Sequence, residues 1–183
     1  MQSMFIRVVP NILTITRICL APIICILIYM NTNVTNIVSI ILTCIACATD
    51  RLDGSFARKY NICSSFGRCL DPIADKILVM SLIVMLVYLH KAWVFAGIVI
   101  LFRELMISGV REFIATEKQL TIHVTKIAKI KTATQMLALL LILSANINST
   151  TLLIGNILFS IAAILSLISG AQYIFSLRHL LLR

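Results

Sequence analysis

Acidic side chains are scarce in this sequence. Seven Asp and Glu stand against sixteen Lys and Arg in 183 residues, and the only acids before position 100 are four aspartates. Charged residues make up 13% of the chain and hydrophobic residues 60%. Soluble globular domains are only about half apolar. The composition therefore excludes a soluble domain and indicates one integral membrane domain over residues 1–183.

The net charge of +9 would suggest a nucleic-acid partner in a soluble protein. Here most basic residues lie near predicted helix ends, which favours anionic membrane lipid and phosphate-bearing substrates and predicts no nucleic acid. Cys44 and Cys47 form a C-x2-C, but no second cysteine pair or histidine cluster completes a zinc site. The cysteines lie mainly in apolar runs and are interpreted as buried, small apolar side chains.

No cleavable signal peptide is expected, because Pro10-Asn11 and Arg17 interrupt the apolar start. Met1–Val9 is short and apolar and carries Arg7, so we predict an interfacial segment that ends at Pro10. Six later runs are long enough to cross a bilayer. They are Ile12–Met30, about Ile37–Arg58, about Gly67–Leu89, about Ala92–Ile114, Lys126 to about Leu143, and about Leu152–Leu177. The predicted fold class is an all-α integral membrane protein with six transmembrane helices.

Basic residues gather on one side of this predicted topology. They are Arg51, Arg58, Lys59, Arg68, Lys118, Lys126, Lys129, Lys131, Arg178 and Arg183. The opposite loops contain only Lys91. By the positive-inside rule, both termini and the aspartates face the cytoplasm, and the expected location is a bacterial inner membrane.

All four aspartates lie within 26 residues. Asp50 and Asp53 are spaced i,i+3, whereas Asp71 and Asp75 are spaced i,i+4, so each pair shares one face of a helix. The polar segment Lys59–Phe66 is predicted to be a turn that reverses the chain. Two antiparallel helices would bring the four carboxylates together as an oxygen-rich site suited to Mg²⁺ or Mn²⁺.

The alternative is a solvated rim in which these aspartates pair with Arg51, Arg58, Arg68 and Lys76. Such a rim would explain one or two of the acids. It does not explain why other acids are absent from the first hundred positions. Carboxylates at the edge of apolar helices are costly to desolvate, which favours the metal site.

The spacing D-x2-D-G-x2-A-R-x8-G-x3-D-x3-D, from Asp50 to Asp75, resembles the signature of the CDP-alcohol phosphotransferase family. All eight fixed positions match. The resemblance implies that Asp50, Asp53 and Asp71 hold two divalent cations and that Asp75 is the catalytic base and also contacts the second metal. It further implies that Gly54, Arg58 and Ser64 contact the nucleotide or pyrophosphate of a CDP-lipid.

Asn11, Thr14 and Arg17 follow one another at helical spacing in the first predicted membrane helix. They are interpreted either as a cap with a snorkelling arginine or as a polar wall of the CDP-lipid pocket. The pattern Pro10-Asn11-x-Leu13-Thr14-x-x-Arg17, followed by Pro22, is similar to the branch of the family that makes phosphatidylglycerol phosphate. That similarity favours the pocket for Asn11 and Arg17 and leaves Thr14 open.

Arg103, Glu104 and Arg111 lie close to one face of the fourth predicted helix. Ion pairs within the helix are one interpretation, and a phosphate clamp is the other. Lys129 and Lys131 follow on the next helix, where lysine clusters often mark only the cytoplasmic side. This region resembles the same branch, which implies that Arg103, Arg111, Lys129 and Lys131 bind an acceptor phosphate. Ala128 departs from the glycine expected there.

The resemblance thus implies a phosphatidyl transferase whose substrates are CDP-diacylglycerol and, from the likeness of the first and fourth helices, glycerol 3-phosphate, with a homodimer as the family expectation. Serine, inositol phosphate or phosphatidylglycerol remain alternative acceptors within the family. A divalent-cation channel or carrier is a further alternative. The clustering of the acids toward one membrane face argues against a channel.

Overall fold

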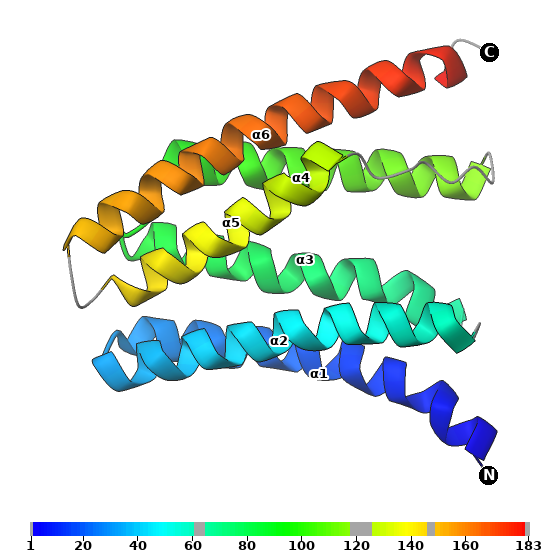
Figure 1. Cartoon of the computed structure of the whole chain (residues 1–183), viewed down its shortest axis with the longest axis horizontal. Coiled ribbons are helices and arrows are strands. Elements are labelled where there is room, and N and C mark those ends of the chain that lie inside the picture. Colours follow the sequence, from blue (N-terminus) through cyan, green and yellow to red (C-terminus); the bar gives the residue numbers. More distant parts are fainter. Residues whose placement is uncertain (1, 61–64, 118–125, 146–148, 182–183) are drawn as a thin grey trace. The chain divides into compact units, whose positions relative to one another are not determined.

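The computed structural model describes residues 2–60, 65–117, 126–145 and 149–181, and all the elements in these ranges are α-helices (Figure 1). They are α1 Gln2–Met30, α2 Asn33–Tyr60, α3 Ser65–Tyr88, α4 Val94–Glu117, α5 Lys126–Ser144 and α6 Ser149–Leu181. The predicted all-α class is confirmed. Within the described residues, Ile127–Ser144 and Ser149–Phe175 are long and apolar enough to cross a membrane, and α1, α2 and α3 contain shorter apolar stretches.

The chain divides into two compact units, Met1–Leu86 and Val87–Arg183. In the first unit α1 packs along α2. The Cys25 side chain on α1 hydrogen-bonds to Ser81 on α3. The chain reverses between the end of α2 and the start of α3, and the two helices run in opposite directions (Figure 1). The turn was predicted to span Lys59–Phe66, but Lys59 belongs to α2 and Phe66 to α3, and residues 61–64 lie outside the described part of the chain.

The face of α2 that is buried in this unit is made of small and polar side chains. Asn36, Ser39, Thr43 and Ala46 are buried, whereas three of the isoleucines between them are exposed: Ile37, Ile41 and Ile45. The hydroxyl of Ser39 donates to the carbonyl of Asn36 at 2.8 Å, and that of Thr43 donates to the carbonyl of Ser39 at 2.7 Å. Small residues let neighbouring helices approach closely, and an apolar exterior is stable only in contact with lipid. This distribution supports a membrane location.

The α1–α2 connection explains why α2 begins at Asn33, earlier than the predicted Ile37. The hydroxyl of Thr32 accepts the Thr35 N–H at 3.2 Å, and the hydroxyl of Thr35 accepts the Thr32 N–H at 3.1 Å. This reciprocal pair is a capping box with threonine in the position usually taken by Glu or Gln. Asn31 has a φ of 49°, a left-handed conformation that asparagine tolerates and that ends α1.

The predicted break at Pro10 is absent, because α1 continues from Gln2 through Pro10 to Met30. A proline inside a helix removes one backbone hydrogen bond but does not have to end the helix, particularly in apolar surroundings. The separate segment predicted for Met1–Val9 is therefore part of α1 where the structure describes it. The helix bends along its N-terminal part, as expected near a proline (Figure 1).

In the second unit, α6 packs against both α5 and α4. α6 comes close to α5 at Gly155, where an added Cβ would lie 2.8 Å from Cγ1 and 3.1 Å from the backbone nitrogen of Ile142. Only glycine allows the two backbones to come this close. α4 continues to Glu117, past the predicted Ile114, and α6 begins at Ser149, before the predicted Leu152.

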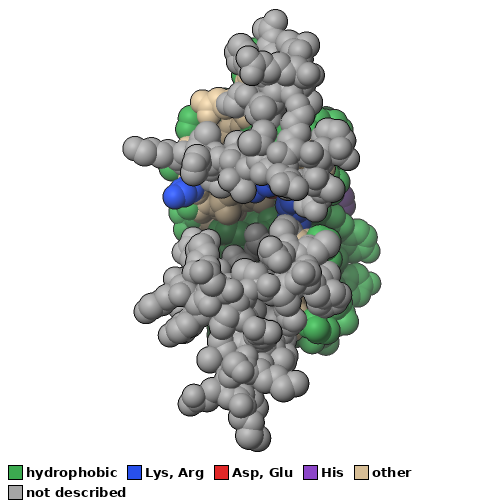
Figure 2. Space-filling model, turned by 90° about the vertical axis from the view of Figure 1, so that its right-hand side faces the viewer, with side chains coloured by type: hydrophobic (Ala, Val, Ile, Leu, Met, Phe, Trp, Pro, Cys, Tyr) green, Lys and Arg blue, Asp and Glu red, His purple; other side chains and the backbone are tan. Residues whose placement is uncertain are grey.

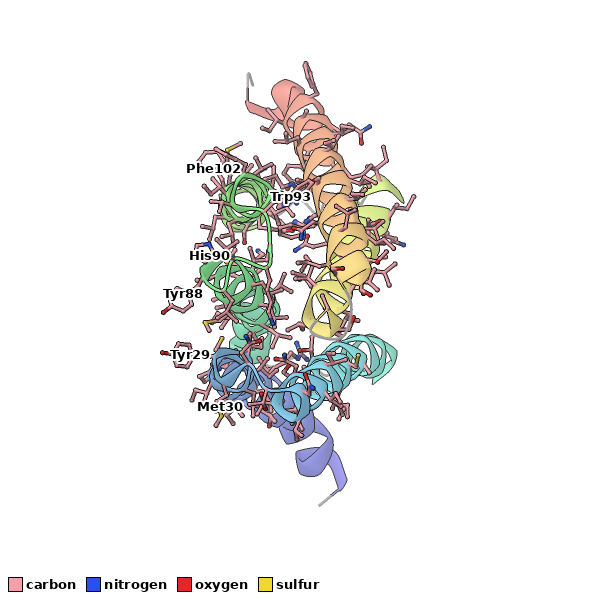
Figure 3. All side chains as sticks on the ribbon, turned by 90° about the vertical axis from the view of Figure 1, so that its left-hand side faces the viewer. Tyr29, Met30, Tyr88, His90, Trp93 and Phe102 are labelled. Carbon is pink, nitrogen blue, oxygen red and sulfur yellow. The ribbon has the colours of Figure 1, made fainter. Side chains whose placement is uncertain are left out.

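Asn156 of α6 holds the connection between α3 and α4. Its Oδ1 accepts the Trp93 N–H at 2.9 Å, and its Nδ2 donates to the Lys91 carbonyl at 2.8 Å and to the Leu152 carbonyl at 3.1 Å. His90, in the same turn, has a φ of 55°. Figure 3 shows the turn with His90 and Trp93 labelled and the Tyr88 ring pointing away from the ribbon. Partial burial lowers the pKa of the Lys91 ammonium.

Candidate functional site

The four aspartates lie on two helices of the first unit, near the reversal of the chain. Asp50 and Asp53 are in α2, and Asp71 and Asp75 are in α3. Both stretches are helical, so each pair shares a face, as the spacing predicts. Asp53 lies seven residues before the end of α2, and Asp71 lies six residues after the start of α3. Asp50 and Asp75 each lie ten residues from the same helix ends. At about 1.5 Å per residue, the pairs lie at matching depths along their helices.

This arrangement fits a site for hard divalent cations by its donor chemistry. Carboxylate oxygens are the ligands that Mg²⁺ and Mn²⁺ prefer, and four of them come from two helix segments joined by a short connection. The side chains of Asp50, Asp53, Asp71 and Asp75 lie outside the described residues. Among the side chains that are described, no group of three His, Cys, Asp or Glu forms another metal site.

The residues predicted to bind the CDP-lipid belong to the same unit. Thr14 and Arg17 are buried on α1, on the face that also carries Ala21 and Ile24, and Arg17 is only 2% exposed. A snorkelling arginine would reach outward, so its burial favours a role inside the helix bundle. Asn11 lies in α1, and Gly54 and Arg58 lie in α2. The side chains of Asn11 and Arg58 are outside the described residues, as is Ser64 altogether.

In the second unit, Glu104 joins two of the predicted cations. Its carboxylate forms an ion pair with Lys131 of α5 and lies 3.6 Å from Nη1 of Arg103. The ion pair within α4 that the sequence suggested is therefore present. Lys131 is 2% exposed, so its ammonium is taken out of solvent beside a carboxylate. Lys129, two residues earlier, is exposed.

The two predicted arginines contact α6. Nη2 of Arg103 donates to the Ser169 hydroxyl at 2.8 Å. The guanidinium carbon of Arg111 lies 5.8 Å from the centroid of the Tyr173 ring. On the face of the molecule shown in Figure 2, Lys and Arg side chains appear among hydrophobic ones within the described part.

Sequence reasoning assigned no role to α6. Its contacts with the arginines come from Ser169, Gly170 and Tyr173, which lie within about one turn. A signal was present, because these residues and Ser166 recur at helical spacing in a mostly apolar helix. The spacing alone did not indicate which neighbouring helix they would face.

Comparison with known proteins finds a match to one protein family over most of the chain. Residues 7–168 match the family model described as CDP-alcohol phosphatidyltransferase. A Rickettsia bellii protein named CDP-diacylglycerol–glycerol-3-phosphate 3-phosphatidyltransferase is 41% identical over 167 residues, which cover 90% of this chain and 92% of that protein. A Salmonella choleraesuis protein of the same name is 36% identical over 173 residues, covering 93% of this chain and 94% of the relative.

Proposed function

Because the chain belongs to the CDP-alcohol phosphatidyltransferase family, we propose that it transfers the phosphatidyl group of CDP-diacylglycerol to glycerol 3-phosphate. The products are phosphatidylglycerol phosphate and CMP. The observation that carries this proposal is the similarity to relatives named for this reaction, which extends over nine tenths of the chain. The eight matching positions between Asp50 and Asp75 lie within that region.

The proposed catalytic centre is the group of four aspartates. Asp50, Asp53 and Asp71 would hold two divalent cations, Mg²⁺ or Mn²⁺, which when bound supply positive charge to the pyrophosphate and its leaving oxygen. Asp75 lies one turn beyond Asp71 and accepts the proton of the acceptor hydroxyl. The oxygen of that hydroxyl then forms the new bond to the phosphorus of the phosphatidyl group, and the bond from phosphorus to CMP breaks.

The proposed CDP-lipid pocket combines two arginines, a glycine and three hydrogen-bonding side chains. Arg17 and Arg58 contribute positive charge for the phosphates, and Gly54 allows the nucleotide to approach the backbone. Asn11, Thr14 and Ser64 contribute hydrogen-bonding groups. The burial of Thr14 and Arg17 inside the first unit supports their part in this proposal.

The acceptor carries a phosphate dianion, which must be attracted to a site rich in carboxylates. Arg103, Arg111, Lys129 and Lys131 are the proposed source of positive charge. Arg111 and Lys129 are exposed, whereas Lys131 is paired with Glu104. We therefore assign the main phosphate contacts to Arg111 and Lys129. Lys131 could contact the phosphate only while it also keeps its ion pair with Glu104.

The proposed setting is a bacterial inner membrane crossed by all six helices, with both termini and the aspartates on the cytoplasmic side. The exposed isoleucines of α2 and the two long apolar helices support a membrane setting. The excess of basic residues on one side supports the orientation. A homodimer is part of the proposal by family expectation.

The test is transfer of labelled glycerol 3-phosphate into lipid by purified protein supplied with CDP-diacylglycerol and Mg²⁺. We expect release of one CMP per lipid formed, loss of activity in chelator, and recovery with Mg²⁺ or Mn²⁺. Asp53→Asn should lower the rate by at least about a hundredfold, because it removes a charged metal ligand. Serine, inositol phosphate and phosphatidylglycerol serve as competing acceptors. Full activity in chelator would refute the metal site, and preference for another alcohol would refute the acceptor.

A further inference from the structure

Arg103 of α4 contacts Ser169 and Gly170 of α6. Its Nη2 donates to the Ser169 hydroxyl at 2.8 Å, and that hydroxyl in turn donates to the Ser166 carbonyl at 3.0 Å. A Cβ added at Gly170 would lie 3.3 Å from Cγ and 3.4 Å from Nε of Arg103. The aliphatic part of the Arg103 side chain therefore crosses α6 at Gly170, which has no side chain to block it.

Arg111, two turns further along α4, is held by an aromatic ring. Its guanidinium carbon lies 5.8 Å from the ring centroid of Tyr173, within the range of a cation–π contact. The ring cannot readily turn away, because Tyr173 is 8% exposed and packs with Ile107, Ile114 and Val110. Arg111 itself is exposed, so its guanidinium remains accessible.

The groups that α6 offers to the two arginines are both uncharged, although Nη1 of Arg103 also lies 3.6 Å from the Glu104 carboxylate within α4. Ser169 uses one guanidinium donor of Arg103, and the ring of Tyr173 attracts Arg111 without taking up any of its N–H donors. Lys131 is held instead by an ion pair with the carboxylate of Glu104. A neutral support fixes a cation while leaving its charge to act on another group. Arg103 and Arg111 also repel one another, so an anion bound near both would relieve that repulsion.

We propose that one face of α6, formed by Ser169, Gly170 and Tyr173, positions Arg103 and Arg111 for the phosphate of the acceptor. The inference rests on the function proposed above and adds α6 to the acceptor site. Tyr173 acts on Arg111, and Ser169 with Gly170 acts on Arg103. These three are positioning residues, because their contacts are with the arginines.

The first arm of the experiment compares Tyr173→Leu, Tyr173→Phe and Phe175→Leu in purified protein. The Michaelis constants for glycerol 3-phosphate and for CDP-diacylglycerol are measured separately, together with kcat. Tyr173→Leu should raise the constant for glycerol 3-phosphate about three- to tenfold, the loss expected for a partly buried cation–π contact. Tyr173→Phe keeps the ring and should stay within about twofold. Phe175→Leu makes the same kind of change at a 69% exposed position of α6 and should have no effect.

The second arm places Tyr173→Leu in an Arg111→Gln background. Because the ring acts through Arg111, the second substitution should then change the constant for glycerol 3-phosphate by less than about twofold. Gly170→Ala, which crowds Arg103 and leaves Tyr173 intact, should also raise that constant. Gly109→Ala is its control, since an added Cβ there meets nothing within 4 Å.

The outcomes separate this inference from the proposed function. If the parent protein uses glycerol 3-phosphate and Tyr173→Leu leaves its Michaelis constant unchanged, the inference is wrong and the function stands. The inference is also wrong if the loss persists undiminished without Arg111, if Tyr173→Phe is as impaired as Tyr173→Leu, or if both Michaelis constants rise together. A Tyr173→Leu protein that does not fold leaves the decision to Gly170→Ala, whose unchanged constant would refute the role of α6. If the parent does not use glycerol 3-phosphate, both proposals fail.

Discussion

Lys131 and Glu104 illustrate how much a single buried charge depends on its partner. The ammonium is almost fully enclosed, and its ion pair joins α5 to α4. Such a pair contributes little net stability compared with an apolar pair of similar volume, because both charges lose their hydration. Removing only one charge of the pair is more costly, since the other charge stays out of solvent without the opposite charge that compensated it.

We predict that Glu104→Gln destabilises the folded protein by about 1.5–3 kcal/mol, because the enclosed Lys131 ammonium then faces a neutral amide in place of a carboxylate. Adding Lys131→Met should recover most of that loss. Thermal unfolding in detergent, followed by the fluorescence of the single tryptophan, measures both. A double variant no more stable than Glu104→Gln alone would contradict a stability role for this pair.

Residue patterns predicted part of this site and could not predict the remainder. Arg103, Glu104 and Arg111 are close in sequence, so helical spacing places them near one face and predicts their local ion pair. The partner of Glu104 on α5 and the partners of the arginines on α6 depend on how three helices pack. The spacing of residues within one helix does not indicate which residues of another helix they will contact. The aspartate pairs were predictable because each lies within one helix and the two helices are neighbours in the chain.

At the scale of elements, the α5–α6 pair depends on one close approach. The backbone of α6 at Gly155 comes so near to Ile142 that a methyl group would meet a backbone atom, which cannot move aside as a flexible side chain can. Interfaces between membrane helices commonly use small residues in this way.

We predict that Gly155→Ala lowers the free energy of unfolding by about 1–3 kcal/mol, the usual cost of overpacking a well-packed contact. Gly109→Ala is the matched control, because it makes the same change inside α4 where space is open. It should be neutral or stabilising by up to about 1 kcal/mol, since alanine is the better helix former. Equal effects of the two substitutions on the unfolding midpoint would show that helix propensity, not the α5–α6 contact, governs the result.

Helix type was predicted for each described element, whereas several helix ends were not. A hydrophobic run of membrane length predicts a helix, because its backbone must form its own hydrogen bonds within the bilayer. Ends depend on local hydrogen bonds, and the cap made by Thr32 and Thr35 was interpreted as part of a loop. The prediction treated Pro10 as it acts in soluble proteins, where it often ends a helix. In apolar surroundings a helix end leaves backbone groups without hydrogen bonds, which favours a continuous helix.

At the scale of the whole molecule, the distribution of basic residues predicts one orientation in the membrane. We expect a fluorescent protein fused after Arg183 to fold and fluoresce in the cytoplasm. Alkaline phosphatase fused after Lys91, which lies in the connection between α3 and α4, should be active on the opposite side. The reverse pattern of reporter activity would contradict the orientation and place the aspartates away from the cytoplasm.

The small, polar interior of α2 has a consequence for how this protein tolerates mutation. In a soluble helix, exposed positions accept almost any polar residue, and buried ones demand large apolar side chains. Here a mutational library should give the opposite map. Ile37, Ile41 and Ile45 should exchange freely with Leu, Val or Phe and reject Asp or Lys, while Ser39 and Thr43 should accept Ala or Gly and reject Leu. Substitution scores calibrated on soluble proteins would therefore misjudge both faces of the helix.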